Sequence, residues 1–424
     1  VDRVDEKGHN VEVASIAYFD FDGMVDVRVI SNKERVNSAR VRPLSYKITP
    51  DCVGDTVTFS LSRPRNLSVE VNGDIFHNLH LFANPIDKFR PSDKEIQRAL
   101  KKKKGSNLIY FGPGVHNLPN DTLFVPSGTT VYIDGGARVY GNIFTEGAHD
   151  VNIFGRGEVH PDGRGAGVWV RRSKNVRIDG IVVSQLPIGQ CDSVELTNVK
   201  SISYYGWGDG MDVFSSSNVI LDGVFCRNSD DCAAVYASTQ GFKGGSNNVL
   251  VKNATLWADV AHPINIGGHG DPNGMDTVQN VTFRNIDILD QAEKQIDYQG
   301  CLAINPGDNT LVRNITFENI RIEDFRNGQL VNFRISFNPK YCVSTGRGIQ
   351  NVLVKDVTYN GSGENLSIIA GYDENHKISG IRFVNLVVNG RKITDDMPGK
   401  PKWYKTGDMA GIFVGEHVEN LSFE

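Results

Sequence analysis

The segment Asn218-Val-Ile-Leu-Asp-Gly-Val is followed, 30 residues further along the chain, by Asn248-Val-Leu-Val-Lys-Asn-Ala. Both segments begin with asparagine, alternate apolar with polar residues, and reach an Asn, Asp or Gly before the next apolar residue. Alternation with a period of two is typical of a strand with one buried face, and Asn or Gly can form a sharp corner. The same pattern recurs from about residue 106 onward, at Asn175, Asn198, Asn280, Asn314, Asn351 and Gly380.

The spacing of these segments indicates how the strands are arranged. Successive segments begin 20 to 37 residues apart, and no amphipathic helix of about 10–15 residues lies between them, which excludes an alternating α/β fold. A leucine-rich repeat is also excluded, because its leucine motif is missing. Repeats of this length, built from short strands, suit a coiled parallel sheet whose apolar residues stack from coil to coil. The sequence therefore predicts an all-β protein with a parallel β-helix over residues 106–424.

The chain before residue 106 has a different pattern. Residues 11–86 contain short β-branched and aromatic runs separated by turn residues, which predicts a small antiparallel β-sandwich in a domain spanning residues 1–88. A linker with a short helix is expected over residues 89–105. Ser92 and Glu95 have the spacing of a capping box, and Gly105 stands where a C-terminal cap is expected.

Composition limits the possible functions. A net charge of −5 gives no indication of a nucleic-acid partner, and no apolar stretch approaches the ~18 residues of a membrane span. The first ten residues carry no signal-peptide pattern, as in a secreted protein whose signal has been removed, and we expect a secreted or periplasmic protein. The six cysteines lack metal-ligand spacing, so buried free thiols are expected, with a Cys226–Cys232 disulfide as the alternative.

An acidic cluster is the main candidate site. Asp209 and Asp230 are 21 residues apart, which is one short coil, and Asp231 follows directly. His262 lies at the corresponding place one coil later. Residues one coil apart are neighbours in space, at roughly the ~4.8 Å spacing of strands, so these four side chains are expected to share one face.

Three carboxylates at this spacing repel one another, which raises the pKa of at least one of them. Glycosidic hydrolysis needs such an arrangement, with a protonated acid for the leaving oxygen and an ionised base for water. The alternative is that these aspartates are corner residues that cap backbone groups. Three of them at one-coil spacing, with His262 on the next coil, favour the catalytic interpretation.

These motifs resemble a known family. Trp207-Gly-Asp-Gly-Met-Asp is similar to Asn-Thr-Asp-Gly-Ile-Asp of polygalacturonases, and Ser229-Asp-Asp-Cys-Ala-Ala to their Asp-Asp-Cys-Ile-Ala. His262-Pro-Ile-Asn-Ile-Gly is similar to their His-Gly-Leu-Ser-Ile-Gly. The resemblance implies a right-handed parallel β-helix and hydrolysis by single displacement with inversion. It also implies that Asp230 is the general acid, that Asp209 and Asp231 activate water, and that His262 supports the cluster.

Departures from the family concern the substrate. Polygalacturonases have an Arg-Ile-Lys motif that binds the substrate carboxylate, and Cys301-Leu-Ala stands there in this chain. Trp207 before the first aspartate and Pro263 after the histidine are closer to the dextranase and isopullulanase family, whose members also place a β-sandwich before the β-helix. The resemblance thus implies a neutral α-glucan such as dextran, with a polygalacturonase-like hydrolase of pectin as the alternative.

Aromatic residues near the motifs are candidates for sugar binding, namely Trp207, Tyr236 and Tyr298, with Tyr204, Tyr205 and Trp257 also close in sequence. Asp373 and Glu374 are expected in a solvated loop. The expected partner is a polysaccharide or oligosaccharide, with no cofactor and no metal. A calcium-dependent lyase is disfavoured because the two Asp motifs contain no Arg or Lys to act as base. A non-catalytic glycan-binding β-helix is the remaining alternative.

Overall fold

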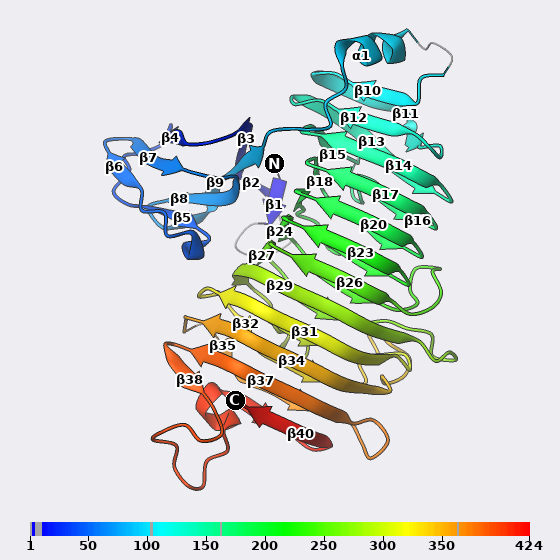
Figure 1. Ribbon diagram of the computed structural model, residues 1–424. Coiled ribbons are helices and arrows are strands. Elements are labelled where there is room, and N and C mark those ends of the chain that lie inside the picture. Colours follow the sequence, from blue (N-terminus) through cyan, green and yellow to red (C-terminus); the bar gives the residue numbers. More distant parts are fainter. Residues whose placement is uncertain (1, 5–10, 102–104, 162, 363) are drawn as a thin grey trace.

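The computed structural model describes residues 2–4, 11–101, 105–161, 163–362 and 364–424. Its largest element is a right-handed parallel β-helix, in which 29 strands form one continuous sheet. A small β-sandwich lies beside this stack of coils (Figure 1). The predicted fold class is confirmed. The division of the chain at residues 88 and 105 remains a proposal.

The β-helix is built from three ladders of parallel strands. The first contains β10 (Leu108–Phe111), β12 (Thr130–Ile133), β14 (His149–Gly155), β17 (Lys174–Asp179), β20 (Asp192–Thr197), β23 (Ser217–Asp222), β26 (Asn247–Lys252), β29 (Thr277–Gln291), β31 (Leu311–Ile322), β34 (Gly348–Tyr359), β37 (Ile378–Val388) and β40 (Val418–Phe423). The second contains β11 (Gly114–Phe124), β13 (Ala137–Glu146), β15 (Glu158–His160), β18 (Val182–Val183), β21 (Lys200–Ile202), β24 (Phe225–Asn228) and β27 (Thr255–Ala258), and merges into β29. The third starts from β13 and contains β16 (Val168–Arg171), β19 (Ile188–Gly189), β22 (Met211–Phe214), β25 (Ala233–Tyr236), β28 (Ile264–Ile266), β30 (Leu302–Ile304), β33 (Val331–Arg334), β36 (Ser367–Ala370) and β39 (Ile412–Val414).

The repeated asparagines form the corners that the sequence predicted. Asn218 and Asn248 have φ of 58° and 57°, in the left-handed region that asparagine tolerates. Val219 pairs with Val249, so the two segments lie on successive coils. The Asn248 amide also donates to Oδ1 of Asn218 at 2.7 Å, which extends the stack into the side chains.

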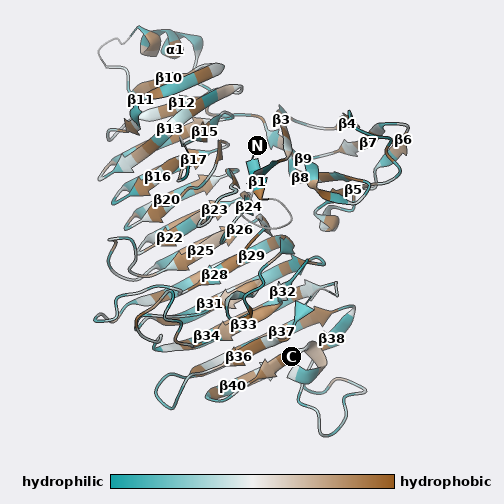
Figure 2. Cartoon of the chain, turned by 180° about the vertical axis from the view of Figure 1, so that it is seen from behind, coloured by the Kyte–Doolittle hydropathy of each residue, from teal (hydrophilic) through white to brown (hydrophobic). Residues whose placement is uncertain are grey.

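The alternating apolar residues fill the interior of the coils. Val219, Val249 and Val281 are in register, and each is at most 1% exposed. Burying a side chain of this size contributes about 1.5–3 kcal/mol, repeated on every coil. Figure 2 shows the hydrophobic segments alternating with hydrophilic ones along the stacked strands. All six cysteines are free, and four of them are buried as expected, whereas Cys52 and Cys342 are only partly buried.

The sandwich consists of two small sheets around an apolar core. One sheet has the order β3 (Ser15–Phe21), β9 (Asp74–Pro85), β8 (Arg65–Val71) and β5 (Ala39–Arg42), and the other has β4 (Val25–Ile30), β7 (Thr56–Leu61) and β6 (Asp51–Val53). The pairing is antiparallel except between β3 and β9. The remaining elements are β1 (Asp2–Val4), β2 (Val11–Val13), β32 (Gly328–Gln329), β35 (Glu364–Asn365), β38 (Arg391–Ile393), α1 (Asp93–Leu100), η1 (Leu44–Tyr46), η2 (Ile296–Tyr298) and η3 (Gly407–Ala410).

Helix α1 follows the sandwich. The predicted capping box of Ser92 and Glu95 is present at its start. The prediction for the other end was wrong, because the C-cap is Lys101 and the helix stops before it can reach Gly105. The described part of the chain contains no helix long and apolar enough to span a membrane.

The sandwich covers the outer face of the second ladder. Phe82 of β9 packs against Ile202 of β21 and Phe225 of β24 in a small buried cluster. Beside it, Arg227 on β24 forms an ion pair with Asp259 at 2.8 Å, and neither side chain is exposed. This covered face includes Trp257, which is 0% exposed, so the expectation that Trp257 could face a sugar was wrong.

Candidate active site

The predicted acidic cluster lies where the second ladder passes into the third. Asp209 is in the loop between β21 and β22, Asp230 and Asp231 are between β24 and β25, and His262 is between β27 and β28. Because β21, β24 and β27 are paired in parallel, as are β22, β25 and β28, the three loops stack on one another. The spacing of the motifs thus brings their side chains to one corner.

Backbone hydrogen bonds fix these loops together. The amide of Gly210 donates to the carbonyl of Asp231 at 2.7 Å, and the amide of Cys232 donates to that of His262 at 2.9 Å. A Cβ at Gly210 would lie 2.3 Å from the Cys232 carbonyl, so a larger residue would separate the loops. The glycine after Asp209 therefore permits this close approach.

Asp231 is the most firmly held of the three predicted carboxylates. It is 1% exposed, and its Oδ1 lies 2.7 Å from Nδ1 of His262. Its Oδ2 accepts hydrogen bonds from the Tyr236 hydroxyl and, at 2.8 Å, from the Asn265 amide. Although burial alone raises the pKa of Asp231, the charge and hydrogen bond of His262 and those two donors lower it below its usual value.

The pKa values of Asp209 and Asp230 are shifted in the opposite direction from that of Asp231. Burial, followed by the charges of Asp209 and Asp231, raises the pKa of Asp230 well above its usual value. Burial, followed by the charges of Asp212 and Asp231, does the same for the pKa of Asp209. Among the smaller effects, a side-chain interaction with Asp212 raises the pKa of Asp209 and one with Asp230 lowers it, so burial and the neighbouring charges decide the upward shift.

Asp212 is a carboxyl that the sequence interpretation missed. It is 3% exposed, burial raises its pKa well above the usual value, and its charge in turn raises the pKa of Asp209. The sequence pattern could have indicated this residue, because Asp212 stands between Met211 and Val213 on β22 and both of these neighbours face the core. By strand alternation, Asp212 must then point outward beside Asp209.

Tyr298 and Tyr236 lie at the cluster as predicted, and Trp207 lies on its exposed side. The ring of Tyr298 stands 4.3 Å from that of His262 and 5.1 Å from that of Tyr341. Tyr236 and Tyr298 border a small hollow of about 50 Å³ that His269 and Tyr341 also line. Trp207 is 76% exposed.

A second hollow, of about 320 Å³, lies on the N-terminal side of the cluster. Tyr204 and Tyr205, from the loop that carries Asp209, form one wall. Arg138 and Glu158, from earlier coils, line it as well. The carboxyl cluster is therefore flanked by polar and aromatic hollows along the axis of the β-helix.

The other predicted features have simple structural roles. Asp373 lies in a tight turn, where its Oδ1 contacts Nδ1 of His376 at 2.7 Å, and Glu374 is exposed. Ala303 lies beside Asn265 on the neighbouring coil, and Cys301 is buried. Among the described residues, no group of three or more His, Cys, Asp or Glu side chains has the arrangement of a metal site.

Similar proteins of known sequence are mostly polygalacturonases. The chain is 26% identical to a polygalacturonase of Juniperus ashei over 295 residues, covering 62% of this chain and 54% of that protein. It is 24% identical to a probable endopolygalacturonase D of Neosartorya fischeri over 285 residues, covering 58% and 55%. The chain thus spans about half the length of these curated relatives.

Solved structures share the fold at low identity. Dex49A from Penicillium minioluteum matches with a TM-score of 0.63 and 14% identity, over 96% of this chain and 83% of that one. The family 28 exopolygalacturonase of Yersinia enterocolitica matches with a TM-score of 0.54 and 13% identity, over 86% and 85%. The family model of glycosyl hydrolases family 28 matches residues 168–397, which include every residue of the carboxyl cluster. The chain therefore belongs to glycosyl hydrolases family 28.

Proposed function

We propose that this protein hydrolyses glycosidic bonds of a polysaccharide by a single displacement with inversion. The observation that carries the proposal is the opposite electrostatics of two adjacent carboxyls. The pKa of Asp230 is raised, first by burial, and that of Asp231 is lowered by His262 and its other hydrogen-bond donors. One protonated and one ionised carboxyl at the same site are what a hydrolase needs for its acid and its base.

In this proposal Asp230 protonates the leaving oxygen of the glycosidic bond. Asp209 and Asp231 activate the attacking water: one of the two carboxylates accepts its proton, and the other orients the water by a hydrogen bond. His262 lowers the pKa of Asp231. The raised pKa of Asp230 supports its assignment as the acid; burial contributes most to this shift, and the charges of Asp209 and Asp231 come next. The hollow of about 320 Å³ beside Tyr204 and Tyr205 provides room for a sugar on one side of the bond that is cleaved.

The sugar bound beside the carboxyls is proposed to be neutral, with an α-glucan such as dextran as the first candidate. The row Ala234, Asn265, Ala303 and Asn332 runs along the third ladder beside the site, and its members are uncharged and at most 2% exposed. This row therefore supplies no cation that could pair with a sugar carboxylate at the carboxyl cluster.

Hydrolysis of a galacturonan is the second candidate. It is favoured by the relatives of the chain, which include a polygalacturonase and a probable endopolygalacturonase. With either polymer the substrate is outside the cell, which is consistent with the expected secreted or periplasmic location. A non-catalytic glycan-binding role is the third possibility, and it predicts no release of reducing ends.

Digestion of a glycan panel tests the proposal. Dextran, other neutral glycans and polygalacturonate are incubated with the purified protein, and new reducing ends are measured. The anomer released in the first minutes is read by proton NMR, and inversion is expected. Cleavage of polygalacturonate with all neutral glycans untouched would replace the first candidate by the second. An unsaturated product that absorbs in the ultraviolet and needs calcium would instead indicate a lyase.

A further inference from the structure

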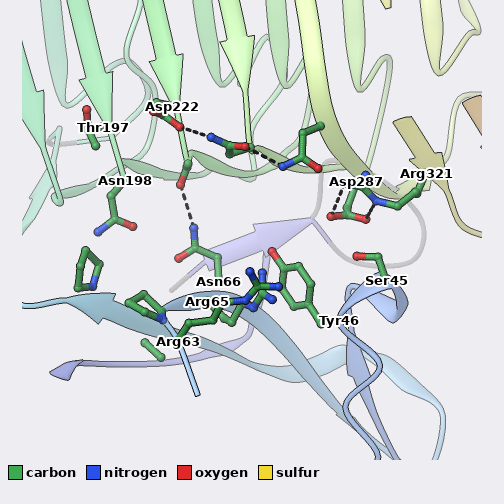
Figure 3. A pocket seen from close by; sticks show the side chains of 16 residues that line it. Ser45, Tyr46, Arg63, Arg65, Asn66, Thr197, Asn198, Asp222, Asp287 and Arg321 are labelled. Carbon is green, nitrogen blue, oxygen red and sulfur yellow. Dashed lines mark hydrogen bonds and ion pairs between the residues drawn. The ribbon is translucent and has the colours of Figure 1, made fainter. Parts of the chain in front are cut away.

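A large cavity of about 620 Å³ lies between the sandwich and the β-helix (Figure 3). The sandwich contributes Tyr46, Arg63 and Arg65 to its lining, and the β-helix contributes Asp222 and Asp287, among others. It opens at the beginning of β24, whereas the carboxyl cluster follows the end of that strand. The cavity is therefore separate from the proposed active site.

The walls of the cavity are fixed by contacts between the two parts of the chain. The amide of Asn66 donates to the carbonyl of Gly223 at 3.0 Å. Tyr46 is partly buried, and its hydroxyl interacts with the side chain of Thr255 on β27. Binding a ligand here would need little rearrangement, and preformed sites at domain interfaces are common places for ligands.

The acidic side chains of the cavity already have cationic partners. Asp222 lies 3.1 Å from Nζ of Lys252. Asp287 accepts two hydrogen bonds from Arg321, at 2.6 and 3.0 Å. These carboxylates are thus largely neutralised by the β-helix itself.

The two arginines that the sandwich contributes to the cavity, Arg63 and Arg65, are not neutralised by a carboxylate in this way. Arg63 is exposed, and no partner is found for its side chain in the part of the chain that the structure describes. The Arg65 guanidinium stacks on the Tyr46 ring at 3.9 Å. Within the same described ranges, Arg65 forms no ion pair with a carboxylate. Burial, and then the like charge of Arg63, lowers the pKa of Arg65.

Polar groups of the kind that bind sugar hydroxyls surround these arginines. Ser45 and Thr197 line the cavity, and within the described residues neither hydroxyl has a hydrogen-bond partner. Figure 3 shows Ser45 near Asp287 and Arg321, and Arg63 and Arg65 extending into the space between the sandwich and the β-helix. The cavity thus combines two guanidinium groups that form no ion pair with a carboxylate in the described residues, one of them held on Tyr46, with hydroxyls that have no hydrogen-bond partner there.

We propose that this cavity binds an acidic oligosaccharide, with the carboxylate of a uronic acid residue held by Arg63 and Arg65. A guanidinium matches a carboxylate with two parallel hydrogen bonds, which makes arginine suited to this recognition. Ser45 and Thr197 bind the hydroxyl groups of the same sugar or its neighbour. The sandwich then acts as a second binding surface that keeps the protein on an acidic polysaccharide. This inference does not depend on which glycan the active site cleaves.

Calorimetric titration tests the proposal. The protein carries Asp230→Asn so that no substrate is turned over, and trigalacturonate is the acidic probe. A binding event is expected that Arg63→Ala/Arg65→Ala weakens at least tenfold and that rising salt also weakens. Arg28→Ala is the matched control, because Arg28 is an exposed arginine of the sandwich outside the cavity, and it should leave binding unchanged. Isomaltotriose, a neutral trisaccharide, should not give the arginine-dependent event.

Loss of the Tyr46 contact could affect folding in the double variant, so a single charge reversal is also used. Arg63→Glu changes only an exposed side chain without a partner in the described residues, and it should abolish the same event while leaving thermal unfolding unchanged. The proposal is overturned if trigalacturonate does not bind. It is also overturned if both Arg63 variants bind like the parent, or if isomaltotriose shows the same dependence on the arginines. None of these outcomes bears on the anomer test of the proposed hydrolysis.

Discussion

The Nδ1 atom of His262 lies 2.7 Å from Oδ1 of Asp231, and neither side chain is more than 1% exposed. His262 lies on the coil that follows Asp231, so the contact depends on the stacking of β25 and β28. Its effect is to lower the pKa of a buried carboxyl, because burial alone would raise the pKa of Asp231. This relationship leads to the first prediction.

His262→Ala should lower kcat about 10²-fold, near the lower end of what acid–base groups contribute. Removing the imidazole raises the pKa of Asp231, since His262 is what lowers it most. The acid limb of the kcat/KM profile should therefore move to higher pH. His269→Ala is the control, because His269 contacts the Tyr236 ring at 5.1 Å without bonding to Asp231. That variant should change KM and leave the acid limb in place.

Asp212→Asn should move the acid limb the other way. After burial, the charge of Asp212 is the largest cause that raises the pKa of Asp209. Without that charge Asp209 ionises at lower pH, so the acid limb of kcat/KM should shift to lower pH. An unchanged limb would show that Asp212 has only a structural role.

The same substitution should stabilise the fold at neutral pH. The pKa of Asp212 is raised by burial, so its stabilising contribution exists below the unfolded value of about 3.9 and is lost as pH rises through the folded pKa. Asparagine does not titrate, so Asp212→Asn should unfold at a higher temperature than the parent at pH 7. The difference should vanish near pH 4. Asp51→Asn, at an exposed position of the sandwich, should show no such pH dependence.

Local patterns predicted those parts of the molecule that repeat along the chain. The coils could be recognised because each needs an inward apolar face and a corner such as Asn218, whose φ is 58°. The meeting of Asp209 with Asp230 followed from a spacing of one coil. The contacts of Trp257 could not be predicted in this way, because it lies under the sandwich and the repeat does not show which face the sandwich covers.

The contacts of segments inserted between the strands of a coil could not be predicted from the repeat either. Tyr298 lies on η2, between β29 and β30, and its hydroxyl comes within 3.5 Å of Asp231, which is 67 residues earlier. An inserted segment is not paired in register with the neighbouring coils, so its position in space cannot be derived from the number of residues per coil. Sequence therefore suggested Tyr298 as an aromatic near the site but gave no reason for its contact with His262.

Arg227→Ala should strongly destabilise the protein. Arg227 and Asp259 are both fully buried, and Arg227 also contacts the Trp257 ring at 4.0 Å and the Asn78 side chain of the sandwich at 2.9 Å. Without Arg227, the buried Asp259 keeps only its pair with Arg326, and the contacts to Trp257 and Asn78 are lost as well, so the cost should approach that of breaking a buried ion pair, about 3–5 kcal/mol. Denaturant unfolding should show this loss. Arg382→Ala, which breaks an exposed pair with Glu424, should change the free energy of unfolding little, and equal effects of both variants would contradict the argument.

Asp230→Asn tests the proposed acid directly. An asparagine amide has no proton to give, so turnover of the natural polymer should fall by roughly 10²–10⁴-fold. A glycoside with a dinitrophenyl leaving group needs little protonation as the bond breaks, so it should recover most of its rate in this variant. Asp209→Asn removes charge that activates water, which every substrate needs, so the same glycoside should rescue it far less. The measurement is the ratio of the two substrates' kcat/KM in each variant. Equal rescue of both variants would show that the acid and the base have been assigned to the wrong carboxyls.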